Sequence, residues 1–199
     1  MSFLRSMPQA SLLDVFRAYP ELARPLHEFA HRLLRGPSPF TEGEREVLAA
    51  YVSRLNHCAF CEASHTEVAV KYGYDRMVIQ QLALDLTHAD VAERLKPVFH
   101  YVRKLTLAPD QVDQADVMAL YEAGWDETAV THAALVCAYF SFMNRWVDGL
   151  GIQADPAVVQ IAADMLHKNG YAAVIELLDH TRTPGLPETK HDEEQSISS

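Results

Sequence analysis

The sequence predicts an all-α protein built as a single domain, and three observations support this. Apolar residues recur at helical spacing along almost the whole chain, and no stretch shows the alternation of a β-strand. Glycine is scarce, with 8 in 199 residues, and four glycines fall where periodic segments end: Gly36, Gly73, Gly124 and Gly170. Thr41, with Glu44 three residues later, has the pattern of a capping box at a helix start.

Reading the periodicity in order gives ten expected helices. They span Leu12 to Tyr19, Glu21 to Leu34, Glu42 to Leu55, Cys58 to Tyr72, Asp75 to Leu86, Pro97 to Leu107, Ala115 to Ala123, Glu127 to Leu150, Pro156 to Lys168 and Tyr171 to His180. Pro97 and Pro156 suit the first turns of the sixth and ninth helices. Asp113 and Asp126 are candidate N-caps of the seventh and eighth.

Domain organisation follows from the change in composition near the end of the chain. Residues 1–182 form the expected helical domain, without an internal linker or a strong repeat. Residues 183–199 turn polar after Pro184 and Pro187 and are expected to form a flexible tail. A chain of this length buries about 70% of its unfolded surface, so it needs no disulfide staples.

Composition excludes several classes of function. The net charge of −10 argues against a nucleic-acid partner, which would need a basic patch. No apolar run approaches the roughly 20 residues that span a bilayer, and the N-terminus lacks a signal-peptide pattern. We therefore expect a cytoplasmic protein without membrane partners. In that reducing compartment, a close cysteine pair indicates redox chemistry or metal binding.

The most informative segment contains Cys58, Cys61 and His65. On a helix beginning near Cys58 these side chains share one face, and Asn56 or His57 would start that helix. Cys58 would then lie in the first turn, where free backbone N–H groups favour the reactive thiolate. Helical residues three apart place their Cβ atoms about 5–6 Å from each other, further than a disulfide prefers, so a bond between the two cysteines should be easily reduced.

Glu46 lies on the preceding expected helix, away from its apolar face. It shares its own face with Ala49, Ala50 and Ser53, which would leave room for a substrate or a chain of water molecules. Glu46 and His65 together would form a proton relay for the thiols.

From the residues alone, three interpretations of this segment stand beside each other. The first is a redox pair. In the second, the cysteines are small buried hydrophobes, His65 is a core histidine and Glu46 is a surface carboxylate. In the third, Cys58, Cys61 and His65 supply three zinc ligands, although no second cysteine pair offers the fourth.

These residues resemble the motif of the alkylhydroperoxidase D-like proteins, within the carboxymuconolactone decarboxylase superfamily, and the peroxidase-related branch is the most similar. The family pattern is a Glu, eleven residues, Cys-x-x-Cys, three residues and a His, which Glu46, Cys58, Cys61 and His65 satisfy. The resemblance extends over residues 40–150. It includes Lys104-Leu105-Thr106, the Gly124 turn, Ala138-Tyr139-Phe140, Asn144-Arg145 and Asp148-Gly149-Leu150.

The resemblance implies an all-helical homo-oligomer with a peroxidase-like site and no metal or cofactor. In the family, the second cysteine, here Cys61, attacks a hydroperoxide, and the first, here Cys58, closes the disulfide. The Glu and His, here Glu46 and His65, pass protons through water. One departure is Phe60, where the best-studied members have a second histidine; His57, one residue before the pair, is a poor substitute. Decarboxylation is disfavoured, because the decarboxylases of the superfamily lack the cysteine pair.

The sequence therefore predicts a thiol peroxidase that takes a hydroperoxide as substrate and a thiol or dithiol as reductant. The alternative is a disulfide oxidoreductase or redox sensor that uses the same pair without a peroxide. A third hypothesis is a helical oligomerisation module whose cysteine pair has lost its function.

Other features have plainer interpretations. His27-Glu28-Phe29-Ala30-His31 matches the zinc-protease pattern, but no third ligand follows, and we interpret it as a chance match on a surface face beside a core stripe of Leu26, Phe29, Ala30 and Leu33. Cys137 is expected to be an inert core thiol. Asn144 and Asp148 are expected to have structural roles. The helix from Glu127 to Leu150 is apolar on much of its circumference, so the core or a partner subunit should bury it.

Overall fold

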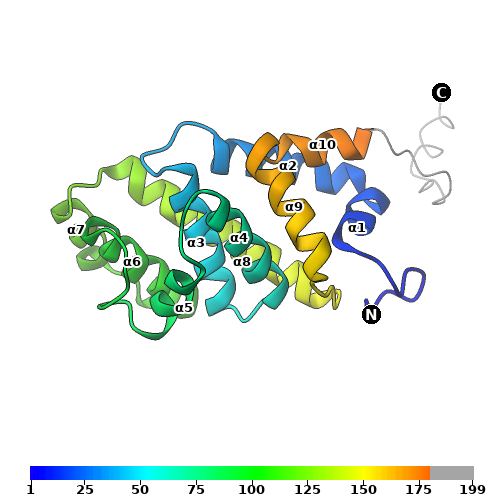
Figure 1. Ribbon diagram of the computed structural model, residues 1–199. Helices are drawn as coiled ribbons and strands as arrows, with labels where there is room; N and C mark the ends of the chain where they lie inside the picture. Colours follow the sequence, from blue (N-terminus) through cyan, green and yellow to red (C-terminus); the bar gives the residue numbers. More distant parts are fainter. Residues whose placement is uncertain (180–199) are drawn as a thin grey trace, which may run out of the picture.

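The computed structural model describes residues 1–179, and this part of the chain is all-α (Figure 1). Its α-helices are α1 (Leu12–Ala18), α2 (Pro20–Arg35), α3 (Glu42–Leu55), α4 (Ala59–Lys71), α5 (Arg76–Leu84), α6 (Lys96–Leu107), α7 (Gln114–Glu122), α8 (Glu127–Gly149), α9 (Pro156–Asn169) and α10 (Ala172–Asp179). Short 3-10 turns at Glu93–Leu95 and Pro109–Gln111 precede α6 and α7. The ten expected helices are confirmed within about two residues at each end, while His180 and the expected tail at 183–199 lie outside the described residues.

Local capping explains why the boundaries agree so well. Thr41 and Glu44 exchange the two hydrogen bonds of a capping box at the start of α3, at 3.1 and 2.7 Å. Asp113 caps α7 in the same way, and the Asp126 carboxylate accepts from the third residue of α8. After α9, Gly170 has φ 63, a left-handed conformation that glycine adopts without strain.

Three helices, α3, α4 and α8, form the centre of the molecule. α3 packs most extensively against α4 and also contacts α8, while α9 lies against α4. α5, α6 and α7 lie at one end, and α1, α2, α9 and α10 lie at the other, where the N-terminus also lies (Figure 1). Because α3 is enclosed by its neighbours, nearly all of its residues are buried, not only the expected stripe of Leu48, Tyr51, Val52 and Leu55.

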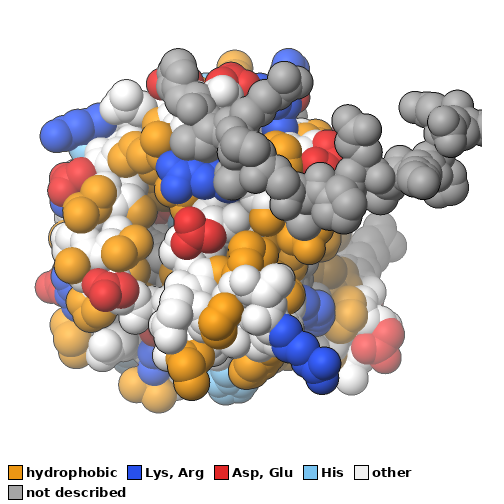
Figure 2. Space-filling view, turned by 90° about the vertical axis from the view of Figure 1, so that its right-hand side faces the viewer, with side chains coloured by type: hydrophobic (Ala, Val, Ile, Leu, Met, Phe, Trp, Pro, Cys, Tyr) orange, Lys and Arg blue, Asp and Glu red, His pale blue; other side chains and the backbone are white. Residues whose placement is uncertain are grey.

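The apolar circumference of α8 is divided between core and surface. Ala133, Val136 and Phe140 are buried in the core, whereas Leu135 and Phe142 are exposed. Apolar side chains are also exposed among charged ones on the face of the molecule seen in Figure 2. Val158 and Ile161 of α9 are exposed as well. Within residues 1–179, no helix is both long and apolar enough to cross a membrane.

Candidate functional site

The candidate site is built on the hairpin of α3 and α4, whose connection is only Asn56, His57 and Cys58. The backbone N–H groups of His57 and Cys58 still bond back to the last turns of α3, and His57 then turns the chain with φ 61. Cys58 is the N-cap of α4, with an extended backbone at φ −84 and ψ 94. The expectation that Cys58 lies in the first helical turn is therefore wrong by one residue, and the Cβ spacing of two helical residues does not apply to the cysteine pair.

The hairpin brings Glu46 and His65 into contact, nearly three helical turns before the connection and about two turns after it. The Oε2 atom of Glu46 lies 2.7 Å from Nδ1 of His65, and Glu46 is fully buried. The edge of the His65 ring packs against Phe140, with 4.4 Å between the ring centroids. Because an ionised carboxylate only accepts hydrogen bonds, Nδ1 carries the proton, and Nε2 is the nitrogen with a free lone pair.

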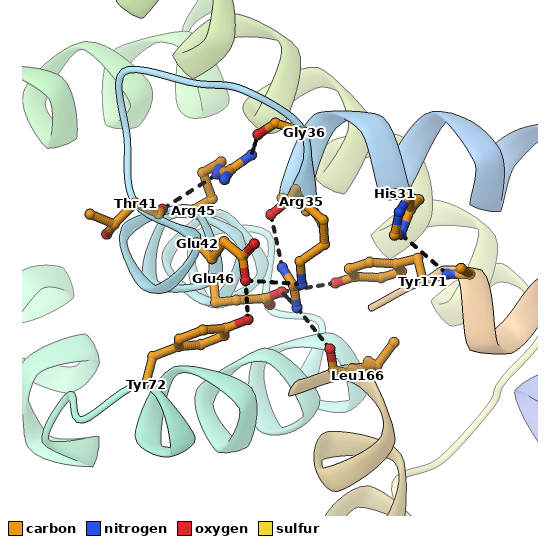
Figure 3. Close-up of polar contacts among 12 residues, drawn as sticks. His31, Arg35, Gly36, Thr41, Glu42, Arg45, Glu46, Tyr72, Leu166 and Tyr171 are labelled. Carbon is orange, nitrogen blue, oxygen red and sulfur yellow. Dashed lines mark hydrogen bonds and ion pairs between the residues drawn. The ribbon is translucent and has the colours of Figure 1, made fainter. Parts of the chain in front are cut away.

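Two further residues complete the surroundings of Glu46, and the sequence interpretation missed both (Figure 3). Arg35, the last residue of α2, places Nη2 2.7 Å from Oε1 of Glu46. The hydroxyl of Tyr171, just before α10, donates to the same oxygen at 3.2 Å. No local pattern marks these two residues, because α2 and the α9–α10 turn meet α3 only in the folded chain.

Ionisation of Glu46 depends on these contacts. Burial alone would raise the pKa of the carboxyl group, but the hydrogen bond and charge of His65 and the guanidinium of Arg35 outweigh burial and hold this pKa below its usual value. The expected open space beside Glu46 is absent in the structure. Ala49, Ala50 and Ser53 are buried among neighbouring helices, and the Ser53 hydroxyl donates to the Ala49 carbonyl oxygen at 2.8 Å.

The two thiols lie in a separate, apolar part of the site. Cys58 and Cys61 are both free and buried, at 0% and 4% exposure. They pack with Val15, Val147 and Ile152, and around these lie Leu4, Ala10, Leu12, Phe60, Trp146 and Leu150. Leu4 and Ala10 of the N-terminal segment 1–10 therefore pack against the cluster that contains the cysteine pair. The backbone of this segment is tied to the end of α8 by the bond from Phe3 N–H to the Leu150 carbonyl oxygen, at 2.8 Å.

The surroundings of Cys61 favour its protonated thiol. The hydrogen bond to Cys58 and then burial raise the pKa of the Cys61 thiol well above its usual value, and the amide of Asn144 opposes this only in part. The Asn144 amide nitrogen also donates to Ser53 Oγ at 3.0 Å, and its oxygen accepts from Asn56 at 3.0 Å. Asn144 thus holds the connection between α3 and α4 against α8, beside the thiols.

Phe60 and His57 lie in different surroundings, one apolar and the other exposed to solvent. Phe60 packs in the apolar cluster with the cysteines, at the position where a second histidine would stand in the related motif. His57 is exposed and lines a cavity of about 400 Å³ together with residues such as Arg54, Glu62 and Arg103. His57 is therefore not arranged to replace the missing histidine beside the thiols.

The remaining sequence candidates do not join this site. His27 is buried, not on the surface as we expected, and its Nδ1 bonds to the Ala23 carbonyl oxygen, while Phe29, assigned to the core stripe, is 41% exposed. His31 Nδ1 accepts the N–H of Ala172. Cys137 is buried, and its Sγ lies 3.2 Å from Oγ1 of Thr106.

Among residues 1–179, no three His, Cys, Asp or Glu side chains are grouped to hold a metal ion, so the residues do not fit the zinc alternative.

This geometry combines two chemical capacities on one helix. The thiol pair can form and break a disulfide. One turn further along α4, His65 can accept or deliver a proton while Glu46 holds its ring. Within the described residues, the hydrogen-bond partners of His65 are Glu46 and Tyr171, so any proton path to the thiols requires an intervening group such as water.

Comparison with known proteins agrees with this picture. Residues 20–95 match the carboxymuconolactone decarboxylase family, and this segment includes Arg35 and the whole cysteine motif. No curated protein sequence is significantly similar to the chain.

Two solved structures share the fold. One is an alkylhydroperoxidase core structure, a peroxidase-related protein from Ralstonia eutropha JMP134, with a TM-score of 0.68 and 23% identity. The other is a peroxidase-related protein from Silicibacter sp. TM1040, with a TM-score of 0.69 and 21% identity. Each similarity covers 75% of this chain and 78% of the other. Residues 20–95 are thus similar to the carboxymuconolactone decarboxylase family, and the chain shares the all-α, alkylhydroperoxidase D-like fold of these two structures.

Proposed function

We propose that the protein is a thiol-dependent peroxidase. Cys61 attacks the outer oxygen of a hydroperoxide, the O–O bond breaks, and the products are an alcohol and a sulfenic acid on Cys61. The Cys58 thiol then displaces water from that sulfenic acid and forms the disulfide. An external thiol or dithiol returns the pair to its reduced state by disulfide exchange.

The observation that carries this proposal is the buried Glu46–His65 pair on the same hairpin as the cysteines. A purely structural cysteine pair has no need of a buried carboxylate and imidazole in contact at 2.7 Å. A thiol peroxidase does need such a pair, because the attacking thiol must lose a proton and the leaving alkoxide must gain one. The resemblance of Glu46, Cys58, Cys61 and His65 to the alkylhydroperoxidase motif supports the same roles.

The raised pKa of Cys61 makes a base necessary in this protein. With Cys61 protonated and donating to Cys58, the free thiolate is scarce at neutral pH. We propose that His65, through water that enters when the N-terminal segment moves, takes the proton from Cys61 and gives it to the leaving oxygen. Glu46 orients the imidazole and stabilises its charged form during this transfer.

The cover over the thiols suggests the class of substrate. Its residues are apolar, among them Leu4, Val15 and Ile152, so an organic hydroperoxide with an apolar group would enter more favourably than hydrogen peroxide. We further propose a cytoplasmic homo-oligomer, in which the exposed Leu135 and Phe142 of α8 contribute to the contact between subunits.

Stopped-flow mixing of the reduced protein with an organic hydroperoxide tests the proposal. All variants carry Cys137→Ser, so that only the pair reacts. We expect the Cys58→Ser variant to consume one equivalent of hydroperoxide and to hold a sulfenic acid that dimedone traps at Cys61. We expect the Cys61→Ser variant to react at least about a hundredfold more slowly, the lower range for loss of a positioned catalytic group.

If Cys61→Ser reacts as fast as the parent, the assignment of the attacking thiol is wrong. If the parent exchanges disulfides with a dithiol but consumes no peroxide, the protein is a disulfide oxidoreductase or redox sensor instead. If neither thiol reacts with peroxide, dithiol or alkylating reagent in the folded protein, the pair is a structural remnant.

A further inference from the structure

We infer that Arg35 and Tyr171 are positioning residues for the Glu46–His65 pair, and that Arg35 keeps this pair able to accept a proton at neutral pH. This inference deepens the proposed function and rests on it. Neither residue belongs to the cysteine motif, yet both bond directly to the Glu46 carboxylate.

The position of Arg35 is fixed from several sides. Its guanidinium donates to the carbonyl oxygens of Leu34 and Leu166, at 2.9 and 3.2 Å, and so joins the end of α2 to α9. The rings of Tyr72 and Tyr171 lie 5.5 and 5.2 Å from it. Only 6% of the side chain is exposed. A cation held this firmly acts as a fixed charge beside Glu46, with little capacity to rearrange.

The two oxygens of Glu46 are used by different partners. Arg35 and Tyr171 both bond to Oε1 (Figure 3). Oε2 therefore remains for Nδ1 of His65. This division fixes the plane of the carboxylate and, through it, the ring of His65 in the tautomer whose Nε2 can accept a proton. Without Arg35 and Tyr171, the carboxylate could rotate and the orientation of the imidazole would no longer be determined.

Arg35 also balances the charge of the buried carboxylate. A buried ion requires an opposite charge nearby. Arg35 is permanently protonated, so Glu46 is neutralised whether or not His65 carries a proton. His65 is therefore free to cycle between its neutral and charged forms, as a proton carrier must. Without Arg35, the negative charge of Glu46 would be opposed by His65 alone, and this would favour the imidazolium over the neutral imidazole.

The other groups around the pair do not replace Arg35. The titratable and charged groups that face Glu46, His65 or Arg35 are Glu42 and Arg45 from α3, Tyr72 from α4 and Tyr171 before α10, and Tyr139 from α8 faces Tyr171 in turn. Arg45 is occupied by the carbonyl oxygens of Leu33 and Gly36, at 2.9 Å each. Burial raises the pKa of Tyr171 well above its usual value, so this tyrosine is a neutral donor and supplies no charge.

The test compares Arg35→Met with Arg35→Lys and Tyr171→Phe, all in a Cys58→Ser, Cys137→Ser background. The first readout is the pH dependence of the reaction of Cys61 with an organic hydroperoxide. The second is the protonation state and tautomer of His65, from the side-chain 15N shifts of histidine-labelled protein. Arg24→Met is the matched control, because Arg24 also ties α2 to α10, through Asp179, but lies outside the site.

In Arg35→Met the unbalanced carboxylate should draw a proton onto the pair. We expect His65 to be charged at pH 7. The midpoint at which the rate rises with pH, as His65 loses its proton, should move up by at least about one pH unit. This shift would lower the rate at pH 7 by about tenfold. Arg35→Lys keeps the charge and should restore most of the profile. Tyr171→Phe should leave the profile in place but allow a mixture of His65 tautomers. Arg24→Met should match the parent in both readouts.

Two outcomes would overturn the inference. One is an Arg35→Met protein that is folded by circular dichroism and has the parent's profile and the parent's His65 shifts. The other concerns a folded Arg35→Lys protein. If Arg35→Met also folds, the contradicting result is that both variants show the same pH profile and His65 shifts. If Arg35→Met does not fold, the contradicting result is that His65 in Arg35→Lys differs in charge from His65 in the parent. Failure of the proposed function would look different: the parent would consume no peroxide, while the nitrogen shifts would still report the effect of Arg35 on His65.

Discussion

The two halves of the candidate site lie on the same α3–α4 hairpin but are held in opposite ways. The hydrogen-bond and ion-pair partners of Glu46 come from three other elements, with Arg35, His65 and Tyr171 each bonded to its carboxylate. Around the cysteines, the contacts are apolar, and part of the cover is an N-terminal segment that precedes the first helix.

This difference matters because the two halves have different requirements. A buried carboxylate is tolerated only where its partners are permanently in place, so the polar half must be rigid. A neutral thiol can be buried among apolar side chains without a polar partner, so apolar packing alone can shield the thiol half from solvent. Apolar packing of a segment outside the helices is released more easily than a buried ion pair, so the thiol half is the one that we propose opens to a substrate.

The largest effect should come from breaking the polar half. Glu46→Gln leaves the Arg35 guanidinium buried without a counter-charge and should lower the free energy of unfolding by about 3–5 kcal/mol in urea titrations. Because the pKa of Glu46 is lowered in the folded protein, its contribution is present at neutral pH and declines as the pH falls through that lowered value. The loss in the variant should therefore shrink in acid.

The matched control is Glu62→Gln. Glu62 also pairs with an arginine, Arg54, at 2.6 Å, but both side chains are about a quarter to a third exposed, at 25% and 32%. Solvent screening limits such a pair to about 0–1 kcal/mol. Equal losses in the two variants would contradict the distinction between a buried, structural carboxylate and an ordinary surface one.

A smaller effect should come from loosening the cover of the thiol half. Leu4→Ser removes an apolar side chain from the segment that packs near the cysteines. Loss of about 2 kcal/mol of apolar contact would raise the population of the open form, and the rate of alkylation by N-ethylmaleimide, by about thirtyfold. Mass spectrometry after timed quenching gives the rate at each cysteine.

Leu84→Ser provides the comparison for this change, since Leu84 is 82% exposed on α5, at the other end of the molecule. It should leave the alkylation rate unchanged. If Leu4→Ser also leaves it unchanged, the reagent reaches the thiols by another route and the N-terminal segment is not their cover.

The same contrast explains what the sequence could predict. The helices were predictable because their signals are local: capping boxes such as Thr41 with Glu44, and glycines at helix ends. The spacing of Glu46, Cys58, Cys61 and His65 was visible because a single hairpin carries all four residues. Contact between Glu46 and His65 is confirmed, and their proposed roles stay a prediction.

The missed residues depend on tertiary structure. Arg35 and Tyr171 reach Glu46 from α2 and from the turn before α10. A loop separates Arg35 from α3, and Tyr171 is 125 residues from Glu46, so no helical spacing rule connects either residue to Glu46. The prediction of open space beside Ala49 and Ala50 was wrong, and this too depends on tertiary structure. Small residues on a central helix allow neighbouring helices to pack closely. Cys58 was misplaced by one residue because the left-handed conformation of His57 delays the start of α4.

A third prediction concerns the pKa of the Cys61 thiol. The hydrogen bond to Cys58 is the largest cause of the raised pKa of Cys61, so Cys58→Ser should lower that pKa. The rate of Cys61 alkylation should then reach half its maximum about one pH unit or more below the parent, measured from pH 6 to 10 with Cys137→Ser in both proteins. The sign follows from the thiolate being the reactive form: a lower pKa exposes it at lower pH. An unchanged midpoint would mean that burial alone sets the pKa.

The smallest effect should come from placing a polar group in the apolar half. Phe60→His restores the type of side chain that related proteins have between their cysteines. A charged imidazole beside the thiols should favour the thiolate and raise the alkylation rate about threefold at pH 6, equivalent to about 0.6 kcal/mol. The gain should fade as the pH rises towards 8, because the imidazole loses its charge. Phe60→Leu controls for loss of the ring and should show no dependence of this kind. If the two variants follow the same pH profile, the thiol half is insensitive to charge at Phe60, and its reactivity is controlled from the polar half, through Glu46 and His65.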